Sequence, residues 1–427
     1  MIRVVITGLG AVTPLGNSFK GSWNSLKAGL SGIRTVTKVS ASHIKWKAAG
    51  ELKNFRAEDY LSAKEVQRLD PFVHYAVASA IMAAADAGLL QKSEVRSQKS
   101  EEKNRGSNDY YYLASGGVII GSGRGGISSI EKALMQMRNS AIDAPGCRLS
   151  AYLMSATTIS MAASSIAQKL GIQGYCLSIS NACASGSNAI GEAYRLLKTG
   201  FRGPLIAGGT DAPLCRLCIE GYGMSGALSK AEPHFASRPF DRHRDGFVLS
   251  EGACTLVLEN LDVALRRGAE IYGEVIGYGN TVDAFHQTKP DLEGEAQALR
   301  SAIAEAGLKT DDIDYINAHG TSTPIGDRIE AEALLTVFGG KAPHIPVSAI
   351  KSMTGHMLAA SGAFEAACTA MSIREGVVPP TINIREKDSR CNINLITEKS
   401  NHIIKTALSS SFGFGGVNAV LILRKLE

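Results

Sequence analysis

The sequence has no long run of lysine and arginine and no apolar stretch near the length of a membrane span. Its 45 basic and 40 acidic residues leave a formal net charge of +5 over 427 residues. Nucleic acid is therefore not an expected partner, although a local basic patch for an acidic protein partner remains open. Crossing a bilayer takes roughly 20 consecutive apolar residues, so no membrane segment is expected either.

Cysteine is too scattered to form the disulfide framework of a small secreted domain. The eight cysteines are Cys147, Cys176, Cys183, Cys215, Cys218, Cys254, Cys368 and Cys391, and their spacing favours a reducing compartment. Residues 1–6 lead directly into a strand-like run, without the basic and apolar regions of a secretory signal. We therefore expect a cytoplasmic protein.

What the sequence does contain is a repeated alternation of strand-like and helix-like segments. Asp70 and Pro71 begin a helix that ends before Gly88, because Asp is a good N-cap and Pro fits the first helical position. Near residue 260 the alternation starts again, with strands predicted at 271–278, 313–318, 345–350 and 419–423 and helices at 295–306, 327–338 and 356–375. We predict two α/β halves of similar organisation, residues 1–260 and 261–427.

Three conspicuous segments have a plain structural explanation. Residues 91–109 mix charged and small polar side chains without periodicity, which predicts an exposed loop. Residues 118–126 match the spacing of a dinucleotide fingerprint, but no second strand follows to present a ribose-binding acid. We interpret them as a glycine turn that lets backbones approach, with nucleotide binding as the alternative. Cys215 and Cys218 have redox or half-zinc spacing, and without a second pair a structural role is favoured.

Cys183 lies where a predicted strand, residues 175–180, meets a predicted helix, residues 184–199. A thiol in the first turn of a helix is close to free backbone N–H groups, which lower its pKa and favour the thiolate. Cys183 is therefore a candidate nucleophile. The alternative is that it is one more small buried residue among alanine, glycine and serine.

Two histidines have positions similar to that of Cys183. His319 follows the predicted strand 313–318, and strand ends are where open α/β sheets bind their ligands. His356 follows the predicted strand 345–350 and is expected in the first turn of the next helix, where the helix dipole keeps the imidazole neutral. A thiolate with two neutral imidazoles suits acyl transfer from a thioester with stabilisation of an oxyanion. Hydrolysis is the alternative, but no local cysteine protease signature accompanies it.

Six ordered motifs resemble the beta-ketoacyl-[acyl-carrier-protein] synthases, type II branch, of the thiolase-like superfamily. They lie at residues 3–10, 181–186, 238–246, 317–323, 351–356 and 411–418. The resemblance runs from Ile2 to about Leu423 and implies an α/β thiolase-like fold of two duplicated βαβαβαββ halves in an αβαβα five-layer arrangement. It also implies a homodimer, with a heterodimer as the alternative.

The resemblance implies a role for each site residue. Cys183 would attack the acyl thioester of an acyl carrier protein, and the backbone N–H groups of Cys183 and Phe414 would form the oxyanion hole. His319 and His356 would bind the malonyl thioester oxygen while carbon dioxide leaves. Lys351 and Glu365 match the supporting charged pair of the family. The remaining matches are Phe414 as the gate between the two steps, and Thr321, Thr323 and Phe412 as substrate-binding residues, with Thr321 and Thr323 at the phosphopantetheine. Arg124 is a further candidate substrate-binding residue, at the position that borders the acyl pocket in the family.

The implied reaction is the decarboxylative condensation of an acyl thioester with malonyl-[acyl-carrier-protein] in fatty acid elongation. The phosphopantetheine arrives on the carrier protein, and no separate cofactor or metal is implied. The pair of histidines differs from the His and Asn of the initiating synthases. Thiolases use a second cysteine near the C-terminus, whereas no cysteine follows Cys391 in this sequence. A non-catalytic heterodimer subunit and a nucleotide-dependent oxidoreductase are less favoured alternatives.

Several positions depart from the family pattern. Arg124 stands where the family usually has an apolar residue beside the acyl pocket, and Asn181 where threonine is more usual. These departures keep a specialised polyketide, aryl-polyene or modified-lipid pathway open. Lys64, Arg68 and Arg148 match basic positions toward the carrier protein, whereas Gly226 replaces another.

Overall fold

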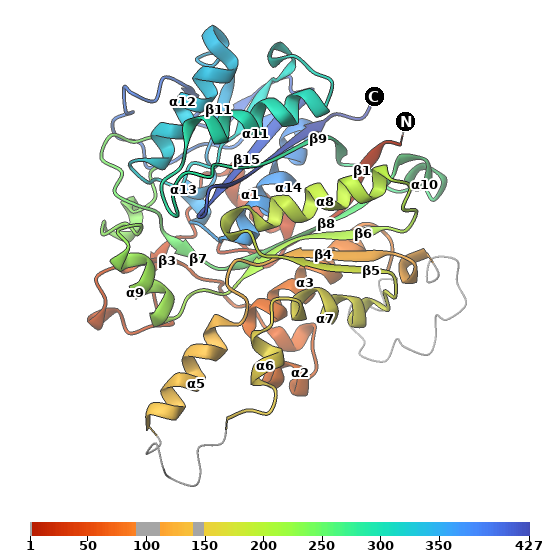
Figure 1. Cartoon of the computed structure of the whole chain (residues 1–427), viewed down its shortest axis with the longest axis vertical. Helices are drawn as coiled ribbons and strands as arrows, with labels where there is room; N and C mark the ends of the chain where they lie inside the picture. The colour runs from red at the N-terminus through yellow and green to blue at the C-terminus, as the bar shows by residue number, and fades with distance from the viewer. Residues whose placement is uncertain (1, 91–111, 140–148) are drawn as a thin grey trace.

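The computed structural model describes residues 2–90, 112–139 and 149–427 (Figure 1). The loop predicted at residues 91–109 and Arg148 lie outside this described part. An 11-stranded sheet has the order β13-β11-β10-β15-β16-β9-β1-β8-β6-β4-β5. β1 and β9 pair at its middle, and there the two halves of the chain join.

The two halves repeat one strand order. The first half supplies β1 (Val4–Val12), β4 (Gly117–Gly121), β5 (Tyr175–Ile179), β6 (Leu205–Asp211) and β8 (Gly252–Asn260). The second supplies β9 (Gly273–Val282), β10 (Tyr315–Asn317), β11 (Pro346–Ser348), β15 (Thr406–Gly413) and β16 (Val417–Arg424). In each half the first strand pairs antiparallel with the last, the last antiparallel with the fourth, and the remaining pairs are parallel. This repeat confirms the predicted duplicated α/β fold; the domain boundary at residue 260 stays a prediction.

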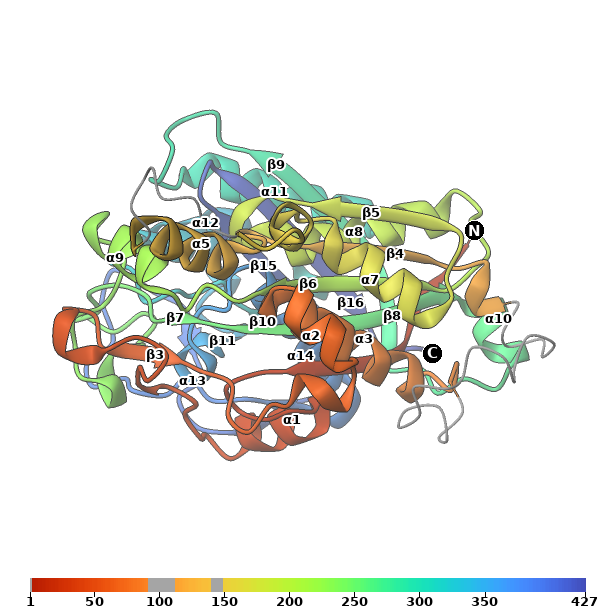
Figure 2. The same ribbon diagram turned by 90° about the horizontal axis from the view of Figure 1, so that it is seen from below.

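Helices cover both outer faces and fill the space between the halves (Figure 1). The first outer layer contains α3 (Pro71–Asp86) and α7 (Met161–Leu170), and Figure 2 shows both in front of the strands of the first half. The second outer layer contains α11 (Leu292–Glu305) and α12 (Gly326–Phe338). Between them lie α8 (Ser185–Lys198) and α14 (Ala359–Glu375), which pack against each other and against strands of both halves. The predicted αβαβα layering is confirmed.

The two central helices approach unusually closely because glycine lies at their crossing. A Cβ atom on Gly186 would come within 2.1 Å of the Ala359 carbonyl oxygen, and one on Gly362 within 2.3 Å of Ser187 Oγ. Nearly every side chain of α14 is buried, as expected for a helix with apolar residues all round. This crossing holds the N-terminal ends of both helices together, and the candidate site is built at those ends.

The remaining elements are short or peripheral. The helices are α1 (Phe19–Lys27), α2 (Ala63–Arg68), α5 (Ile127–Asn139), α6 (Leu153–Thr157), α9 (Arg216–Met224), α10 (Leu261–Arg266) and α13 (Lys351–Thr354). The strands are β2 (Arg34–Thr35), β3 (Ala48–Gly50), β7 (Leu249–Ser250), β12 (Val377–Val378), β13 (Asn394–Leu395) and β14 (Ser400–Asn401). The helix predicted before Gly88 is confirmed as α3, with the Asp70 carboxylate accepting the Phe72 N–H.

Candidate active site

Cys183 lies in a tight turn between β5 and α8. The turn is a 3-10 segment, Ala182–Ala184, and Ala182 has a φ of 47°, which side chains other than glycine rarely adopt. Ser185 stabilises it, because its Oγ accepts the Asn181 N–H at 2.8 Å and donates to the Ala182 carbonyl at 2.7 Å. Strain of this kind is typical of positions that must hold one side chain in a fixed direction.

The expected low pKa of Cys183 is wrong. Burial raises the pKa of the thiol to about 11, although the charges of Lys351 and Arg124 and the Phe414 N–H bonded to the sulfur lower it in part. The helix terminus was the only influence visible in the sequence, and removal from water outweighs it. Cys183 is therefore a neutral thiol at rest.

His319 is fixed by its own backbone and by a lysine. Glu330, on α12, accepts the N–H groups of His319 at 2.7 Å and of Gly320 at 2.8 Å. Lys351 Nζ lies 2.7 Å from the His319 carbonyl oxygen and 3.3 Å from its Nδ1. An ammonium group can only donate, so Nδ1 accepts and Nε2 keeps its proton.

His356 lies outside the helix in which it was expected. α14 begins at Ala359, so His356 belongs to the extended segment before it. Its N–H donates to the Val248 carbonyl at 2.7 Å, and its carbonyl accepts the Ser250 N–H at 3.0 Å. The sequence pattern placed the helix start too early, because it gave no sign of this pairing with the β7 region.

The two imidazoles are neutral, as predicted, for a different reason from the one expected. Burial, the charge of Lys351 and the neighbouring His356 hold the pKa of His319 well below its usual range. Burial and the charge of Lys351 do the same to the pKa of His356. Burial and the Lys351 charge, which the sequence pattern did not indicate, are the causes for both rings.

Both histidine rings meet at the centre of the site. Their ring centroids are 5.4 Å apart at an interplanar angle of 85°. Phe412, at the end of β15, contacts His319 at a centroid distance of 5.7 Å, and Phe247 contacts His356 at 5.3 Å. His356 Nδ1 is 3.2 Å from Ser361 Oγ.

Lys351 and Glu365 form a fully buried ion pair behind the histidines. Their charged atoms are 2.5 Å apart, and each side chain is 1% exposed. Burial raises the pKa of Glu365 to about 7 against the opposing effect of Lys351. The Lys351 charge also acts on Cys183, His319 and His356. The nucleophile and both imidazoles therefore share the field of one lysine.

The Phe414 loop joins β15 to β16 and covers the cysteine. A Cβ on Gly413 would lie 3.3 Å from Cys183 N, so only glycine permits this approach without displacement. Phe414 packs in one apolar cluster with Cys183, and its ring centroid is 6.3 Å from that of Tyr222. The backbone N–H of Phe414 is bonded to the Cys183 sulfur, so the loop lies directly against the candidate nucleophile.

Thr321 and Thr323 lie in the turn after His319. Their Oγ1 atoms are 3.1 Å apart, and Thr323 Oγ1 accepts the Gly326 N–H at 3.2 Å. Asp327, which accepts the Ser322 N–H at 3.0 Å, fixes the turn from α12. Both threonines therefore lie in an ordered turn that directly follows His319.

The glycine turn after β4 is folded around Asp211. Its carboxylate accepts the N–H groups of Gly123 at 3.0 Å and Arg124 at 2.9 Å. These are the donors that a dinucleotide phosphate would need, so the turn does not offer them to a nucleotide. Asp211 also accepts the Ala359 N–H at 2.9 Å and so ties the turn to the start of α14.

Sequence reasoning missed Asp211, Tyr222, Glu330 and Ser361. Asp211 and Glu330 hold site backbone in place, Ser361 contacts His356, and Tyr222 contacts Phe414. Asp211 ends β6, and the end of a strand is a usable signal for a site residue. Tyr222 lies in the last turn of α9, Glu330 in the interior of α12 and Ser361 in the first turn of α14. Nothing in the sequence pattern distinguishes them from ordinary helical residues.

The remaining candidates have structural environments. Cys215 and Cys218 are buried free thiols in an apolar cluster. Among the described residues, no three His, Cys, Asp or Glu side chains gather so as to hold a metal ion. Within the same part of the chain no helix has the length and apolar character needed to span a membrane.

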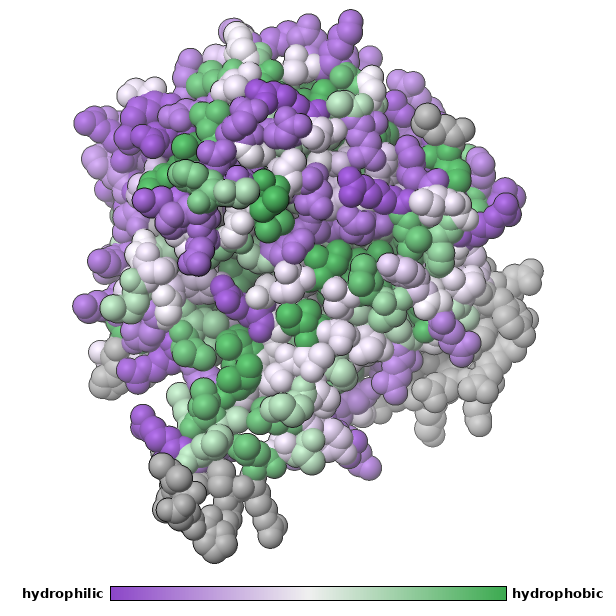
Figure 3. Space-filling model, viewed as in Figure 1, coloured by the Kyte–Doolittle hydropathy of each residue, from purple (hydrophilic) through white to green (hydrophobic). Residues whose placement is uncertain are grey.

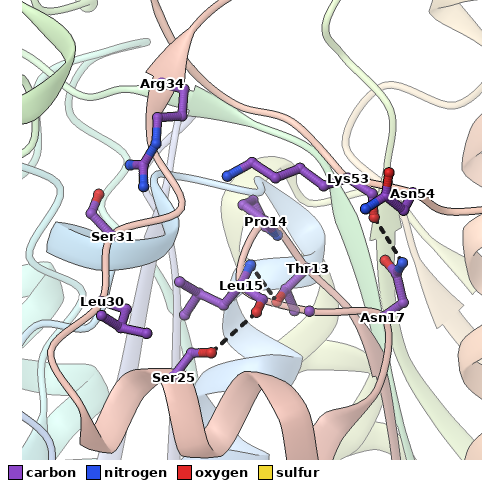
Figure 4. Close-up of a pocket in the computed structure, with 11 residues that line it drawn as sticks. Thr13, Pro14, Leu15, Asn17, Ser25, Leu30, Ser31, Arg34, Lys53 and Asn54 are labelled. Carbon is purple, nitrogen blue, oxygen red and sulfur yellow. Dashed lines mark hydrogen bonds between the residues drawn. The ribbon is translucent and has the colours of Figure 1, made fainter.

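A surface pocket of about 450 Å³ lies away from these residues (Figure 4). Arg34 and Lys53 extend across it, and Thr13, Pro14 and Leu15 line its base. None of the predicted site residues lines it. A second surface pocket touches Gly415 and the loop at residues 284–287.

The geometry defines a thiol nucleophile with two neutral imidazoles on a duplicated α/β fold, and the chain belongs to the beta-ketoacyl synthase family. The family descriptions "Beta-ketoacyl synthase, N-terminal domain" and "Beta-ketoacyl synthase, C-terminal domain" match residues 1–264 and 272–385. The chain is 41% identical over 430 residues to the 3-oxoacyl-[acyl-carrier-protein] synthase 2 of Staphylococcus aureus (strain MRSA252), with 100% of this chain and 99% of the relative covered.

Solved structures agree with this assignment. The ishigamide ketosynthase/chain length factor superposes with a TM-score of 0.89 at 32% identity, over 100% of both chains. A type II PKS ketosynthase, bound to the hexaketide and in complex with its acyl-carrier protein, gives a TM-score of 0.87 at 31% identity, again over 100% of both chains. The resemblance found in the sequence motifs is confirmed.

Proposed function

We propose that the protein condenses an acyl thioester with malonyl-[acyl-carrier-protein] and releases 3-oxoacyl-[acyl-carrier-protein] and carbon dioxide, as in fatty acid elongation. The observation that carries this proposal is that the His319 and His356 rings meet with centroids 5.4 Å apart, while Phe247, which contacts His356, packs in the same cluster as Cys183. A nucleophile beside two neutral hydrogen-bond donors serves both the capture of an acyl group and the stabilisation of an enolate.

In the first step Cys183 sulfur attacks the carbonyl carbon of the acyl thioester. The oxyanion forms against the N–H groups of Cys183 and Phe414. The intermediate collapses with loss of the phosphopantetheine thiol, which takes the proton that leaves Cys183. A neutral resting thiol suits this exchange, because it loses its proton only as the new bond forms.

In the second step the malonyl thioester oxygen accepts hydrogen bonds from Nε2 of His319 and His356. Lys351 fixes the His319 tautomer through Nδ1, and the Ser361 hydroxyl donates to His356 Nδ1 to give the same result. The carbon–carbon bond to the carboxylate breaks, carbon dioxide leaves, and the electron pair forms an enolate. The enolate carbon attacks the acyl group, the thioester bond to Cys183 breaks, and the cysteine thiolate that leaves takes a proton from water.

Phe412 and the two threonines complete the substrate channel in this proposal. Phe412 packs against His319, so its ring limits the position of the malonyl group. Thr321 and Thr323 provide hydroxyl groups beside the turn that carries His319, where an incoming phosphopantetheine would pass. Phe414 would swing away from Cys183 between the two steps, a motion that its flanking residues Gly413, Gly415 and Gly416 permit.

Two features support assembly with other chains. β5 is an edge strand with exposed Tyr175 and Leu177, and Figure 3 shows apolar surface over the neighbouring α5 and α6. We propose a homodimer that covers this surface, with a heterodimer as the alternative outcome of a mass measurement.

The exposed Lys64 and the Arg68 side chain over the Tyr152 ring, both on α2, are proposed to contact the acidic carrier protein.

The test follows acyl transfer and condensation separately. Intact mass after incubation with an acyl carrier thioester is expected to rise by one acyl group, and Cys183→Ala is expected to abolish both this shift and product formation. Retained condensation in Cys183→Ala would reject the proposal.

A panel of acyl carrier thioesters then separates a fatty acid enzyme from the second candidate, a ketosynthase of a specialised pathway. Arg124 favours that second candidate, because a charged side chain near the nucleophile is unfavourable beside a saturated chain.

A further inference from the structure

Arg124 is a charged residue in the site that the proposed reaction does not use. Its Nε donates to the Tyr222 hydroxyl at 2.6 Å, and its guanidinium carbon lies 4.9 Å from the centre of the Tyr222 ring. Its own N–H is bonded to Asp211, so both ends of the residue are held. The side chain therefore has a defined position, although the residue as a whole is exposed.

The guanidinium has unused donors. An arginine side chain carries five N–H groups, and the structure assigns one of them to Tyr222. Within the described residues no carboxylate forms an ion pair with Arg124 and no acceptor is bonded to its Nη atoms. The groups around Cys183 on this side are apolar, among them Ile127 and Ile219. Arg124 is exposed and contacts this cluster through Tyr222, so its free donors face open space beside the apolar groups. A planar cation with free donors at such an edge is suited to an oxygen acceptor.

The position of Arg124 favours the acyl side of the site over the malonyl side. Its positive charge acts on Cys183 and Cys218. The two histidines respond to Lys351 instead, and Arg124 is not among the groups that shift either of them. Tyr222, which holds the guanidinium, contacts the ring of Phe414 above the cysteine.

We propose that Arg124 binds an oxygen atom of the acyl chain carried by Cys183, so that the enzyme prefers oxygenated acyl chains to saturated ones. This inference rests on the proposed function of Cys183. The Nη donors of Arg124 would hold a carbonyl or carboxylate oxygen, while Tyr222 keeps the guanidinium in plane. Arg124 is thus a specificity residue, and the chemistry of condensation needs no step from it.

The experiment measures kcat/KM for four acyl carrier thioesters: butyryl, decanoyl, acetoacetyl and succinyl. In the wild-type protein, kcat/KM for the acetoacetyl or the succinyl thioester is expected to exceed kcat/KM for the butyryl thioester. Whether acetoacetyl or succinyl gives the higher value distinguishes a ketone from a carboxylate as the bound oxygen. A hydrogen bond to a charged group corresponds to about a 10- to 100-fold change. In Arg124→Ile, kcat/KM for the oxygenated chains is expected to fall by that factor, and kcat/KM for decanoyl is expected to rise. Arg124→Lys, which keeps the charge without the planar fork, is expected to lie between them.

Two measurements separate this proposal from other roles of the same residue. Because the Arg124 charge lowers the pKa of Cys183 in part, alkylation by iodoacetamide should shift to higher pH in Arg124→Ile. That shift affects all four substrates equally, so the proposal requires a further loss confined to the oxygenated chains; an equal loss on all four substrates would overturn it and make Arg124 an activator of the thiol. Arg300→Ile, which removes an exposed guanidinium paired with Glu293 on α11, is the control and should match the wild type. If wild-type protein is acylated and condenses but prefers decanoyl, the proposed function stands and this inference falls.

Discussion

The two halves of the molecule share one strand order but carry different chemistry at matching positions. In the first half, β4 leads to the Arg124 turn and β5 to the Cys183 turn. In the second half, β10 leads to His319 and β11 to the segment of His356. The fold therefore brings four strand ends to one place, and the residue types at those ends divide the work between acyl capture and enolate stabilisation.

The match extends to single residues at the starts of the two central helices. Ala182 lies three residues before Ser185 and Leu358 three residues before Ser361, and their φ angles are 47° and 51°. Ser185 Oγ accepts the N–H four residues earlier at 2.8 Å, and Ser361 Oγ does the same at 2.9 Å. The position of Cys183 in this register is taken by Ala359 in the second half. Both halves build a strained turn, and only one of them uses it for a nucleophile.

The largest expected effect comes from moving the nucleophile from the first half to the second. The double variant Cys183→Ala, Ala359→Cys puts a thiol at the matching position of the second half. We expect condensation to fall by at least about 10⁴-fold, because Ala359 is fully buried and its N–H is bonded to Asp211. The measurement is product formation from acyl and malonyl carrier thioesters, together with intact mass. Acylation at position 359 would show that the two turns are interchangeable.

The second prediction separates the tasks of the halves. His319→Gln and His356→Gln should each reduce condensation about 10²- to 10⁴-fold, while acylation of Cys183 persists. Because the pKa of each imidazole is lowered, both are neutral throughout pH 6–8 in the wild type. The condensation rate should therefore show no protonation step near pH 6.5. Single-turnover acylation and a pH profile test this, and a tenfold loss at pH 6 would contradict it.

The third prediction compares the buried ion pair with an exposed one. Lys351→Met leaves the Glu365 carboxyl buried without its partner, and we expect a loss of about 3–5 kcal/mol in the free energy of unfolding. The control Arg300→Met breaks the exposed pair with Glu293 and should cost about 0–1 kcal/mol. Urea unfolding measures both. The double variant Lys351→Met, Glu365→Leu should regain stability without regaining activity, and equal losses in the two single variants would refute the prediction.

Much of the fold follows from the sequence because its signals are local. The predicted strand at residues 313–318 corresponds to β10 (Tyr315–Asn317), and the predicted helix at 327–338 to α12 (Gly326–Phe338). Caps and glycine ends specify such elements within a few residues. The start of α14 was predicted three residues too early, because His356 pairs with Val248 and Ser250, more than 100 positions away.

The site residues could be found, but their electrostatics could not. Cys183, His319 and His356 each stand at a junction that the pattern marks. The pKa of Cys183 depends on how much water surrounds the sulfur, and that follows from the packing of Phe414 and Tyr222 around it. Long-range carboxylate contacts such as those of Asp211 leave no local signal either.

The smallest predicted effects concern Ser185 and Ser361, which occupy matching positions in the two halves. Ser185→Ala and Ser361→Ala each remove one hydroxyl that accepts a backbone N–H, so each should cost about 1 kcal/mol of stability. Ser361 also contacts His356 Nδ1 at 3.2 Å, whereas Ser185 supports the turn of Cys183. We therefore expect Ser361→Ala to slow condensation about tenfold with acylation intact, and Ser185→Ala to slow acylation. Stopped-flow acylation and steady-state condensation measure the two steps, and the same pattern in both variants would mean that the halves do not divide the reaction at these serines.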